Sequence, residues 1–233
     1  MNKVTAIVLA AGQGKRMNTS VAKQFLMLQD KPIIYYTLKA FEQSKVDEII
    51  LVTGEGQIDY CKDEIVELYH IRKVTKIIEG GKERYDSVYR GLSNAQTSDY
   101  VLIHDGARPF IKVEAIDTMI DLVKECKACV LGMPVKETIK VIDDVGHIVA
   151  TPNRNTLWAA QTPQAFEYSL IMQAYEDYYK NKDVVNLVVT DDAMLFEIYG
   201  KLPVMMFPGD YNNIKITTPE DLILAERILS QID

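Results

Sequence analysis

The sequence of 233 residues contains few cysteines and few histidines, three of each. Three cysteines are too few for a disulfide framework, which favours a cytoplasmic protein whose thiols stay reduced. No apolar run approaches the roughly 18 residues that a membrane span needs, so we expect no membrane association. The first residues lead directly into a strand-like run from Val4, so we also expect no signal or transit peptide.

Acidic residues are absent from the first 29 positions, although the chain carries 33 Asp and Glu against 26 Lys and Arg and a net charge of −7. The net acidity argues against a nucleic-acid binder, which needs a cationic surface. The first 29 residues instead hold four cations, Lys3, Lys15, Arg16 and Lys23. An isolated cationic segment on an acidic chain predicts a small anionic ligand.

Short apolar runs alternate with helix-like patterns up to residue 133. The composition, 48% hydrophobic and 25% charged, is that of a globular protein and excludes disorder or a collagen-like repeat. Strands are predicted at 4–10, 48–53, 74–79, 100–104 and 128–133, and helices at 33–38 (with Pro32 in the first helical position), 57–70, 84–95 and 113–126. This alternation predicts an α/β, Rossmann-like fold with a mostly parallel central sheet flanked by helices.

The pattern changes after residue 133. Residues 138–142 and 147–150 alternate in polarity around an acidic turn at 143–146, which predicts a protruding β-hairpin arm over about 136–155. Helices follow at about 167–180 and 190–199 and a strand at about 203–207. A last helix is predicted to begin after the N-cap Thr218, with a buried stripe of Leu222, Ala225, Leu229 and Ile232. Without a linker or repeat, residues 1–233 are expected to form a single domain.

A glycine-containing loop, residues 9–17, follows the first predicted strand. Its small residues would let backbone N–H groups surround phosphate oxygens. The dinucleotide fingerprint needs a third glycine where Met17 stands, and the Walker A loop needs Gly at Leu9 and Ser or Thr at Arg16. The loop therefore matches neither of these two common phosphate-binding motifs.

Three cations, Lys15, Arg16 and Lys23, crowd residues 12–24 with no acid among them. Like charges at this spacing repel one another unless an anion lies between them. The alternative, a tight turn with solvated lysines, does not explain the missing acids. We therefore interpret the segment as a binding site for a polyphosphate.

The loop resembles that of nucleotidyltransferases that join a sugar or polyol phosphate to a nucleoside triphosphate. Along essentially the whole chain, the sequence resembles the 2-C-methyl-D-erythritol 4-phosphate cytidylyltransferase family, because its motifs occur in the order seen in that family. The motifs are Leu9-Ala10-Ala11-Gly12-x-Gly14-x-Arg16-Met17, Lys23-Gln24, Gly80-Gly81-x-x-Arg84-x-x-Ser87-Val88, His104-Asp105-Gly106-Ala107-Arg108-Pro109, Arg154-Asn155-x-Leu157-Trp158, Gln161-Thr162-Pro163-Gln164 and Asn213-Ile214-Lys215-Ile216-Thr217. Ribitol-5-phosphate cytidylyltransferases look similar over much of the chain, but they typically read Ala-Gly-Gly in the loop and lack the context of Trp158.

The resemblance implies that a phosphomonoester oxygen attacks the α-phosphorus of CTP and pyrophosphate leaves, a step towards isoprenoid precursors. A phosphomonoester is largely a dianion at neutral pH, since its second pKa is ~6, so this nucleophile needs no general base. That agrees with the absence of a Ser-His-Asp or Cys-His arrangement. The chemical demand is electrostatic, and cations with Mg²⁺ would meet it. We therefore hypothesise that Arg16 and Lys23 hold the triphosphate and stabilise the pentavalent transition state, with Lys15 assisting.

The other site residues also follow from the resemblance. It implies that the Gly80–Gly81 backbone reads the cytosine edge and that Gly106, where the family usually has Ala, closes over the ribose. The CTP-binding residues would be Ala10, Ala11, Gly12, Gly14, Lys15, Arg16, Lys23, Gly80, Gly81, Lys82, Ser87, Asp105 and Gly106. The acceptor-binding residues would be Asp105, Arg108, Thr138, Arg154, Thr190 and Lys215, and the catalytic residues Arg16, Lys23, Arg154 and Lys215. Mg²⁺ would be held mainly by the CTP phosphates, with Asp105 as a candidate ligand.

Simpler structural interpretations stay open for several of these residues. Arg84 could lie at the surface beside an ordinary glycine turn, and Asp105 could only cap the next helix. Arg154 could form a salt bridge with Asp143 or Asp144. Two further acids, Asp191 and Asp192, fit either a metal site or the first positions of a helix.

The resemblance also implies a homodimer, because in the relatives the arm crosses to a second subunit. Thr138 and Arg154 would then serve the partner's site. Two other functions are considered. One is a ribitol-5-phosphate cytidylyltransferase of teichoic acid synthesis, and the other is a nucleotide-binding module without turnover.

Overall fold

A computed structural model of the protein describes residues 2–12, 14, 17, 22–182, 184 and 187–231. Its centre is a seven-stranded sheet with the order β11-β7-β10-β6-β1-β4-β5. The strands are β1 (Val4–Ala10), β4 (Glu48–Thr53), β5 (Val74–Glu79), β6 (Tyr100–Asp105), β7 (Ala128–Pro134), β10 (Trp158–Glu167) and β11 (Met205–Pro208). Only β10 runs antiparallel to its neighbours in this sheet. The predicted α/β fold with a mostly parallel sheet is confirmed.

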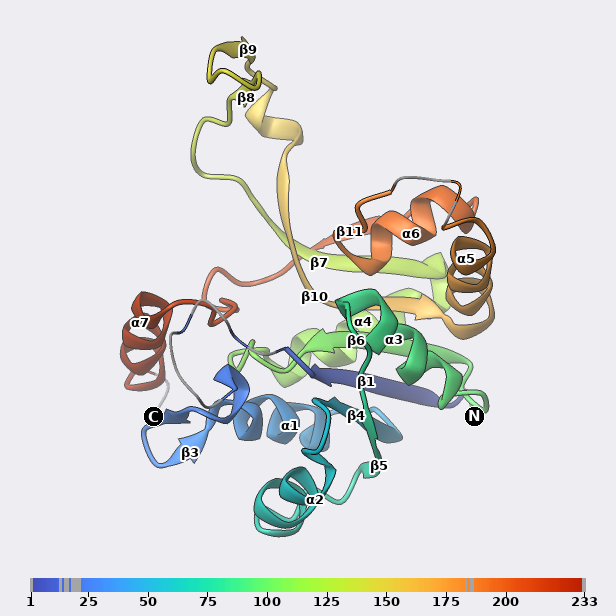
Figure 1. The fold of residues 1–233 in the computed structure, drawn as a ribbon, viewed down its shortest axis with the longest axis vertical. Coiled ribbons are helices and arrows are strands. Elements are labelled where there is room, and N and C mark those ends of the chain that lie inside the picture. The colour runs from blue at the N-terminus through green and yellow to red at the C-terminus, as the bar shows by residue number, and fades with distance from the viewer. Residues whose placement is uncertain are drawn as a thin grey trace.

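Helices cover both faces of the sheet (Figure 1). The helices are α1 (Ile33–Gln43), α2 (Ile58–Tyr60), α3 (Arg84–Ser93), α4 (Val113–Cys126), α5 (Tyr168–Asn181), α6 (Asp192–Tyr199) and α7 (Pro219–Leu229). One core cluster joins the sheet to α1, α4 and a π-helical segment (Cys61–Glu67), and the other joins it to α3, α5 and α6. Strands between two helical layers must be apolar on both sides, which is why β1 reads as a continuous apolar run. None of the helices in the described ranges has the length and hydropathy needed to cross a membrane.

Two local details differ from the sequence-based expectations, and a third prediction falls partly outside the described residues. The helix expected at 57–70 is a single α-turn followed by the π-helical segment. Pro32 is the N-cap of α1 rather than its first helical residue, because it still pairs in the short β2–β3 hairpin (Met27–Leu28 and Lys31–Pro32). In α7, Ala225 and Leu229 are buried as expected and Leu222 is partly buried, whereas Ile232 lies outside the described residues.

The sequence analysis missed β10, an internal strand of the sheet that lies between β6 and β7. Its central residues are polar, and Pro163 cannot donate to a strand ladder, which normally argues against a central strand. The structure accommodates the proline where the pairing of β10 with β7 is irregular, between Ala160 and Gln164.

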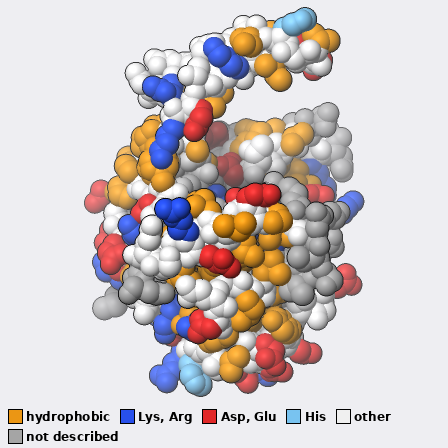
Figure 2. Space-filling view, turned by 90° about the vertical axis from the view of Figure 1, so that its left-hand side faces the viewer, with side chains coloured by type: hydrophobic (Ala, Val, Ile, Leu, Met, Phe, Trp, Pro, Cys, Tyr) orange, Lys and Arg blue, Asp and Glu red, His pale blue; other side chains and the backbone are white. Residues whose placement is uncertain are grey.

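The predicted arm projects from the body of the molecule (Figure 1). It leaves the sheet at the end of β7, pairs β8 (Val141–Ile142) with β9 (Ile148–Ala150), and returns through a 3-10 turn (Arg154–Thr156) into β10. Hydrophobic side chains are exposed on the arm where it overhangs the body (Figure 2). Val145 is 75% exposed and Ile148 62%, so the arm has no core of its own.

Candidate active site

A cleft of about 1380 Å³ opens where β1, β4, β5 and β6 end. In parallel sheets, ligands bind at this carboxyl edge of the strands. The cleft brings together ten of the predicted site residues from distant parts of the sequence. They are Ala11, Gly12, Gly14, Lys23, Gly80, Gly81, Lys82, Ser87, Asp105 and Lys215.

The loop after β1 forms one wall of the cleft. Gly14 has φ +64°, and a Cβ atom at this position would lie 3.1 Å from the Cβ atom of Lys23. Both features favour glycine at this position, where the chain turns and brings Lys23 against the loop. The Gln24 side chain donates to the Ala10 carbonyl, which fixes the following turn on the end of β1. Lys15 and Arg16 lie outside the described residues.

The Gly80–Gly81 turn forms the opposite wall. A Cβ atom at Gly80 would lie 2.5 Å from that of Ala11, so the missing side chain lets the two loops approach closely. The Ser87 hydroxyl accepts a hydrogen bond from the Gly81 amide at 3.0 Å. Arg90 donates to the Gly80 carbonyl at 2.8 Å. In both walls of the cleft, hydrogen bonds from side chains therefore hold the backbone in place.

Asp105, the last residue of β6, lies between three cations. Its carboxylate is 2.8 Å from Lys215 Nζ, 3.2 Å from Arg84 Nε and 3.8 Å from Arg108 Nε. Burial alone would raise the pKa of Asp105, but Arg84 and Lys215 outweigh it and hold that pKa well below its usual range. Asp105 is therefore an anion that orients Lys215 towards the cleft.

His104, next to Asp105, is fully buried under the site. Its Nδ1 lies 3.1 Å from the Thr162 hydroxyl, and its Nε2 lies 3.3 Å from the Arg108 carbonyl. The Thr162 hydroxyl also accepts a hydrogen bond from the Asp105 amide at 3.1 Å. Burial lowers the pKa of His104 to about 3, so the imidazole stays neutral near pH 7 and supports the backbone instead of moving protons.

Some predicted residues do not line the cleft. Ala10 is buried within β1, and Gly106 donates its amide to the Leu9 carbonyl at 2.8 Å behind the cleft wall. Arg108 donates to the Asn213 carbonyl at 2.8 Å, which ties the end of β6 to the segment that carries Lys215. Thr190 is exposed just before α6. Their proposed contacts with substrate stay predictions.

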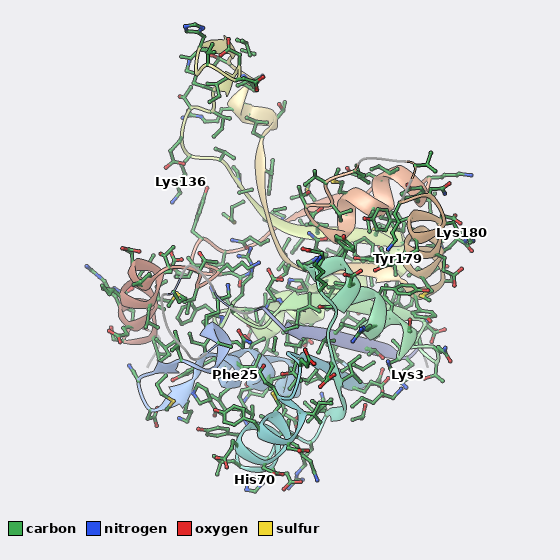
Figure 3. The ribbon with its side chains drawn as sticks, viewed as in Figure 1. Lys3, Phe25, His70, Lys136, Tyr179 and Lys180 are labelled. Atoms are coloured by element: carbon green, nitrogen blue, oxygen red, sulfur yellow. The ribbon has the colours of Figure 1, made fainter. Side chains whose placement is uncertain are left out.

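The two predicted arm residues, Thr138 and Arg154, are exposed and lie away from the cleft. Arg154 donates to the Lys136 carbonyl at 2.8 Å and forms no ion pair with Asp143 or Asp144, the alternative considered for it. Together with Lys136 it lines a second hollow of about 470 Å³. Figure 3 labels Lys136 at the base of the arm.

Acidic side chains in the described ranges do not gather into a metal site, since no group of three or more His, Cys, Asp or Glu could hold an ion there. Asp191 is the N-cap of α6 and accepts from the Met194 amide at 2.9 Å. Asp192 is fully buried and bonds Arg84 at 2.8 and 2.9 Å. The helix interpretation of these two acids is confirmed.

The sequence analysis gave Arg84 no function, although it lines the cleft and contacts both Asp105 and Asp192. The available signal was an arginine at the first position of a helix, three residues after a glycine pair. Its partners could not be found in this way, because Asp192 lies 108 residues further along the chain.

Comparison with known proteins agrees with this geometry. The sequence model of the 2-C-methyl-D-erythritol 4-phosphate cytidylyltransferase family, IspD, matches residues 4–231. A protein of that name from Lachnoclostridium phytofermentans is 53% identical over 99% of this chain and 98% of its own length. One from Clostridium botulinum (strain 657 / Type Ba4) is 48% identical over the full length of both.

Solved structures show the same fold. The 4-diphosphocytidyl-2C-methyl-D-erythritol synthase of Anaerococcus prevotii superposes with a TM-score of 0.85 at 35% identity, covering 98% of this chain and 96% of that one. The 2-C-methyl-D-erythritol 4-phosphate cytidylyltransferase of Thermus thermophilus superposes with a TM-score of 0.78 at 27% identity, covering 98% and 99%. The chain is a member of the 2-C-methyl-D-erythritol 4-phosphate cytidylyltransferase family.

Proposed function

We propose that this protein transfers the cytidylyl group of CTP to 2-C-methyl-D-erythritol 4-phosphate, giving 4-diphosphocytidyl-2-C-methyl-D-erythritol and pyrophosphate. The observation that carries the proposal is the 53% identity over 99% of the chain to a protein of this name. The cleft supports it, because it joins a glycine-turn wall, a second glycine turn and several cations in one space. The product is a precursor on the way to isoprenoids.

CTP would lie between the two glycine turns. The small residues Ala11, Gly12 and Gly14 leave room for the triphosphate, and Lys23 lies beside them. The cytosine would meet the backbone of Gly80 and Gly81, with Ser87 behind it. Backbone N–H groups and lysines are the groups that bind phosphate oxygens most often at such turns.

The reaction would depend on charge rather than on proton transfer. The acceptor phosphate is already a dianion, and the buried His104, with its pKa lowered to about 3, is too weak a base to accept a proton near pH 7. Lys23 and Lys215, with Arg16 by sequence, would stabilise the charge that develops on the oxygens around the α-phosphorus. Donors fixed in place before the reaction are the largest source of such stabilisation.

Magnesium would enter with the nucleotide. The described residues form no cage of their own for an ion, and both oxygens of Asp105 already accept from Arg84 and Lys215. The CTP phosphates would therefore supply most ligands, with Asp105 the candidate carboxylate. The ion would neutralise charge on the leaving pyrophosphate.

The protein would act as a homodimer of single-domain subunits, with each arm reaching the partner. Exposed apolar side chains on the arm, and the position of Thr138 and Arg154 away from their own cleft, favour this arrangement. These two residues would then complete the acceptor site of the partner subunit. A fully active monomer in light scattering would contradict this part of the proposal.

A pyrophosphate-release assay with CTP, Mg²⁺ and one acceptor at a time tests the function. We expect turnover with 2-C-methyl-D-erythritol 4-phosphate and little with ribitol 5-phosphate. The reverse preference would identify the ribitol enzyme. CTP binding without turnover on either acceptor would identify a nucleotide-binding module.

A further inference from the structure

One side chain, Arg84, connects two parts of the candidate site. The proposed function assigns one half, at the Gly80–Gly81 turn, to CTP, and the other, around Lys215 and the start of α6, to the acceptor. It is the first residue of α3 and follows the Gly80–Gly81 turn by three residues. Its guanidinium donates from Nε to Asp105 at 3.2 Å and from Nη1 and Nη2 to the two oxygens of Asp192 at 2.9 and 2.8 Å. A single planar group is therefore shared between two carboxylates.

Asp192 belongs to the acceptor half. It is the first residue of α6 and follows Thr190 by two residues. The carboxylate is 0% exposed and also accepts a hydrogen bond from the Tyr175 hydroxyl at 2.6 Å. No substrate in the cleft can touch it, so any effect of Asp192 on the reaction must pass through the groups that it holds.

The chemistry of arginine suits this connection. Its rigid fork bonds one carboxylate with two N–H groups and keeps another N–H for a second acceptor, whereas a lysine offers a single point charge. Buried ion pairs of this kind hold elements in one arrangement, because separating the charges leaves each without compensation. Moving the Gly80–Gly81 turn therefore moves the start of α6, and through Asp105 it also moves Lys215.

We propose that Arg84 is a positioning residue that couples nucleotide binding at the Gly80–Gly81 turn to the placement of the acceptor loop, residues 187–191, and of Lys215. When CTP binds to the Gly80–Gly81 turn, it restrains the first residue of α3, Arg84. Arg84 passes this constraint to α6 through Asp192 and to Lys215 through Asp105. The proposal rests on the proposed function for its assignment of the two halves to CTP and acceptor.

Hydrogen exchange tests the coupling directly and needs no acceptor. With CTP and Mg²⁺ added to the whole protein, exchange in the peptide 187–199, which spans the acceptor loop and α6, should slow by ~3-fold or more in the wild type, since a coupled element opens less often. In Asp192→Asn the peptide should respond by less than ~1.5-fold, although calorimetry still finds CTP bound with a Kd within ~2-fold of wild type. An unchanged response in the variant, or none in the wild type, would overturn the proposal.

Steady-state kinetics give a second readout. Asp192→Asn should raise the KM for the acceptor by ~10-fold with little change in the KM for CTP. Arg84→Lys should have at least this effect, and the double variant should be no worse than Arg84→Lys, because the two residues act as one unit. Additive losses would mean that Asp192 acts independently of Arg84 and would overturn the coupling.

Tyr175→Phe is the matched control. It removes a buried partner of Asp192 but leaves the pair with Arg84 intact, so it should lower Tm while keeping the acceptor KM and the CTP response. If it shifts both as Asp192→Asn does, general loosening of α5 and α6 is the cause and the proposal fails. If Asp192→Asn does not fold, Asp192→Glu replaces it. A wild type that couples in hydrogen exchange but makes no product from 2-C-methyl-D-erythritol 4-phosphate would refute only the proposed function.

Discussion

Replacing Asp105 by Asn should destabilise the protein even without substrate. The wild-type carboxylate offsets three cations, with its oxygens 2.8 Å from Lys215, 3.2 Å from Arg84 and 3.8 Å from Arg108. Its side chain is only 10% exposed, so water cannot replace it. Asparagine keeps the shape but leaves the cations to repel one another at the bottom of the cleft.

The size of the loss follows from the surroundings of each cation. Removing one partner of a buried ion pair costs about 3–5 kcal/mol. Arg84 keeps Asp192, and Lys215 is 35% exposed and reaches water, which reduces the cost. Arg108 is 12% exposed, and its buried Nε has no hydrogen-bond partner among the residues that the structure describes, so Arg108 loses the most stabilisation when the carboxylate is removed. We therefore expect the free energy of unfolding to fall by about 3 kcal/mol, the lower end of that range. This corresponds to a fall in Tm of about 6–12 °C.

Thermal and urea unfolding of both proteins in phosphate-free buffer measures this difference. The pKa of Asp105 lies below its unfolded value, so its contribution is complete at neutral pH and shrinks as the pH falls below about 4. Pyrophosphate should stabilise the variant more than the wild type, since an anion can take the place of the lost charge.

Asp121→Asn is the control. That carboxylate also contacts two lysines but is 59% exposed, so its replacement should lower the free energy of unfolding by under about 1 kcal/mol. Equal losses in the two variants would refute the reasoning.

Three further outcomes are expected. Lys23→Ala should lower kcat/KM by ~10²-fold or more in pyrophosphate release, and a change within ~3-fold would remove Lys23 from the catalytic set. Gly14→Ala should cost about 1 kcal/mol or more in urea unfolding and raise the KM for CTP, because φ is +64° and the new Cβ meets Lys23. The buried His104, with its pKa lowered to about 3, must take up a proton on unfolding below its unfolded pKa of about 6.5. Wild-type stability should therefore fall by up to about 1.4 kcal/mol per pH unit from there towards pH 3, and His104→Gln should lack that part of the slope in urea titrations at successive pH values.

The sequence predicts the parallel part of the sheet because those strands are buried on both faces. Ile7 and Ile50 are each 0% exposed, and such burial requires the apolar runs that mark β1 and β4. The side chains in the middle of β10 form hydrogen bonds to neighbouring segments instead of packing in an apolar core. The Gln164 side chain bonds Asp191 and the Ala193 amide, and the Thr162 hydroxyl bonds the Asp105 amide. Because these contacts need polar side chains, the middle of β10 lacks the apolar pattern by which strands are predicted from a sequence.

The residues of the candidate site also fall into two groups, those that the sequence identifies and those that it does not. Gly14 and Gly80 could be recognised from the sequence, because a left-handed turn or a close approach of two backbone segments favours glycine. The pairs that Arg84 forms with Asp105 and Asp192 leave no local mark, since arginine and aspartate occur throughout the surface of any soluble protein. Only the folded chain brings residues 84, 105, 192 and 215 to one point.

The arm has a practical consequence for dissecting the enzyme. It begins and ends on adjacent antiparallel strands, since Pro134 of β7 pairs with Trp158 of β10. A short turn joining these two positions would excise the hairpin and leave the whole sheet and the cleft in place. If the proposed dimer forms through the arm, the trimmed chain should be a monomer that still binds CTP. If Thr138 and Arg154 also serve the partner's acceptor site as proposed, the trimmed chain should not transfer the cytidylyl group.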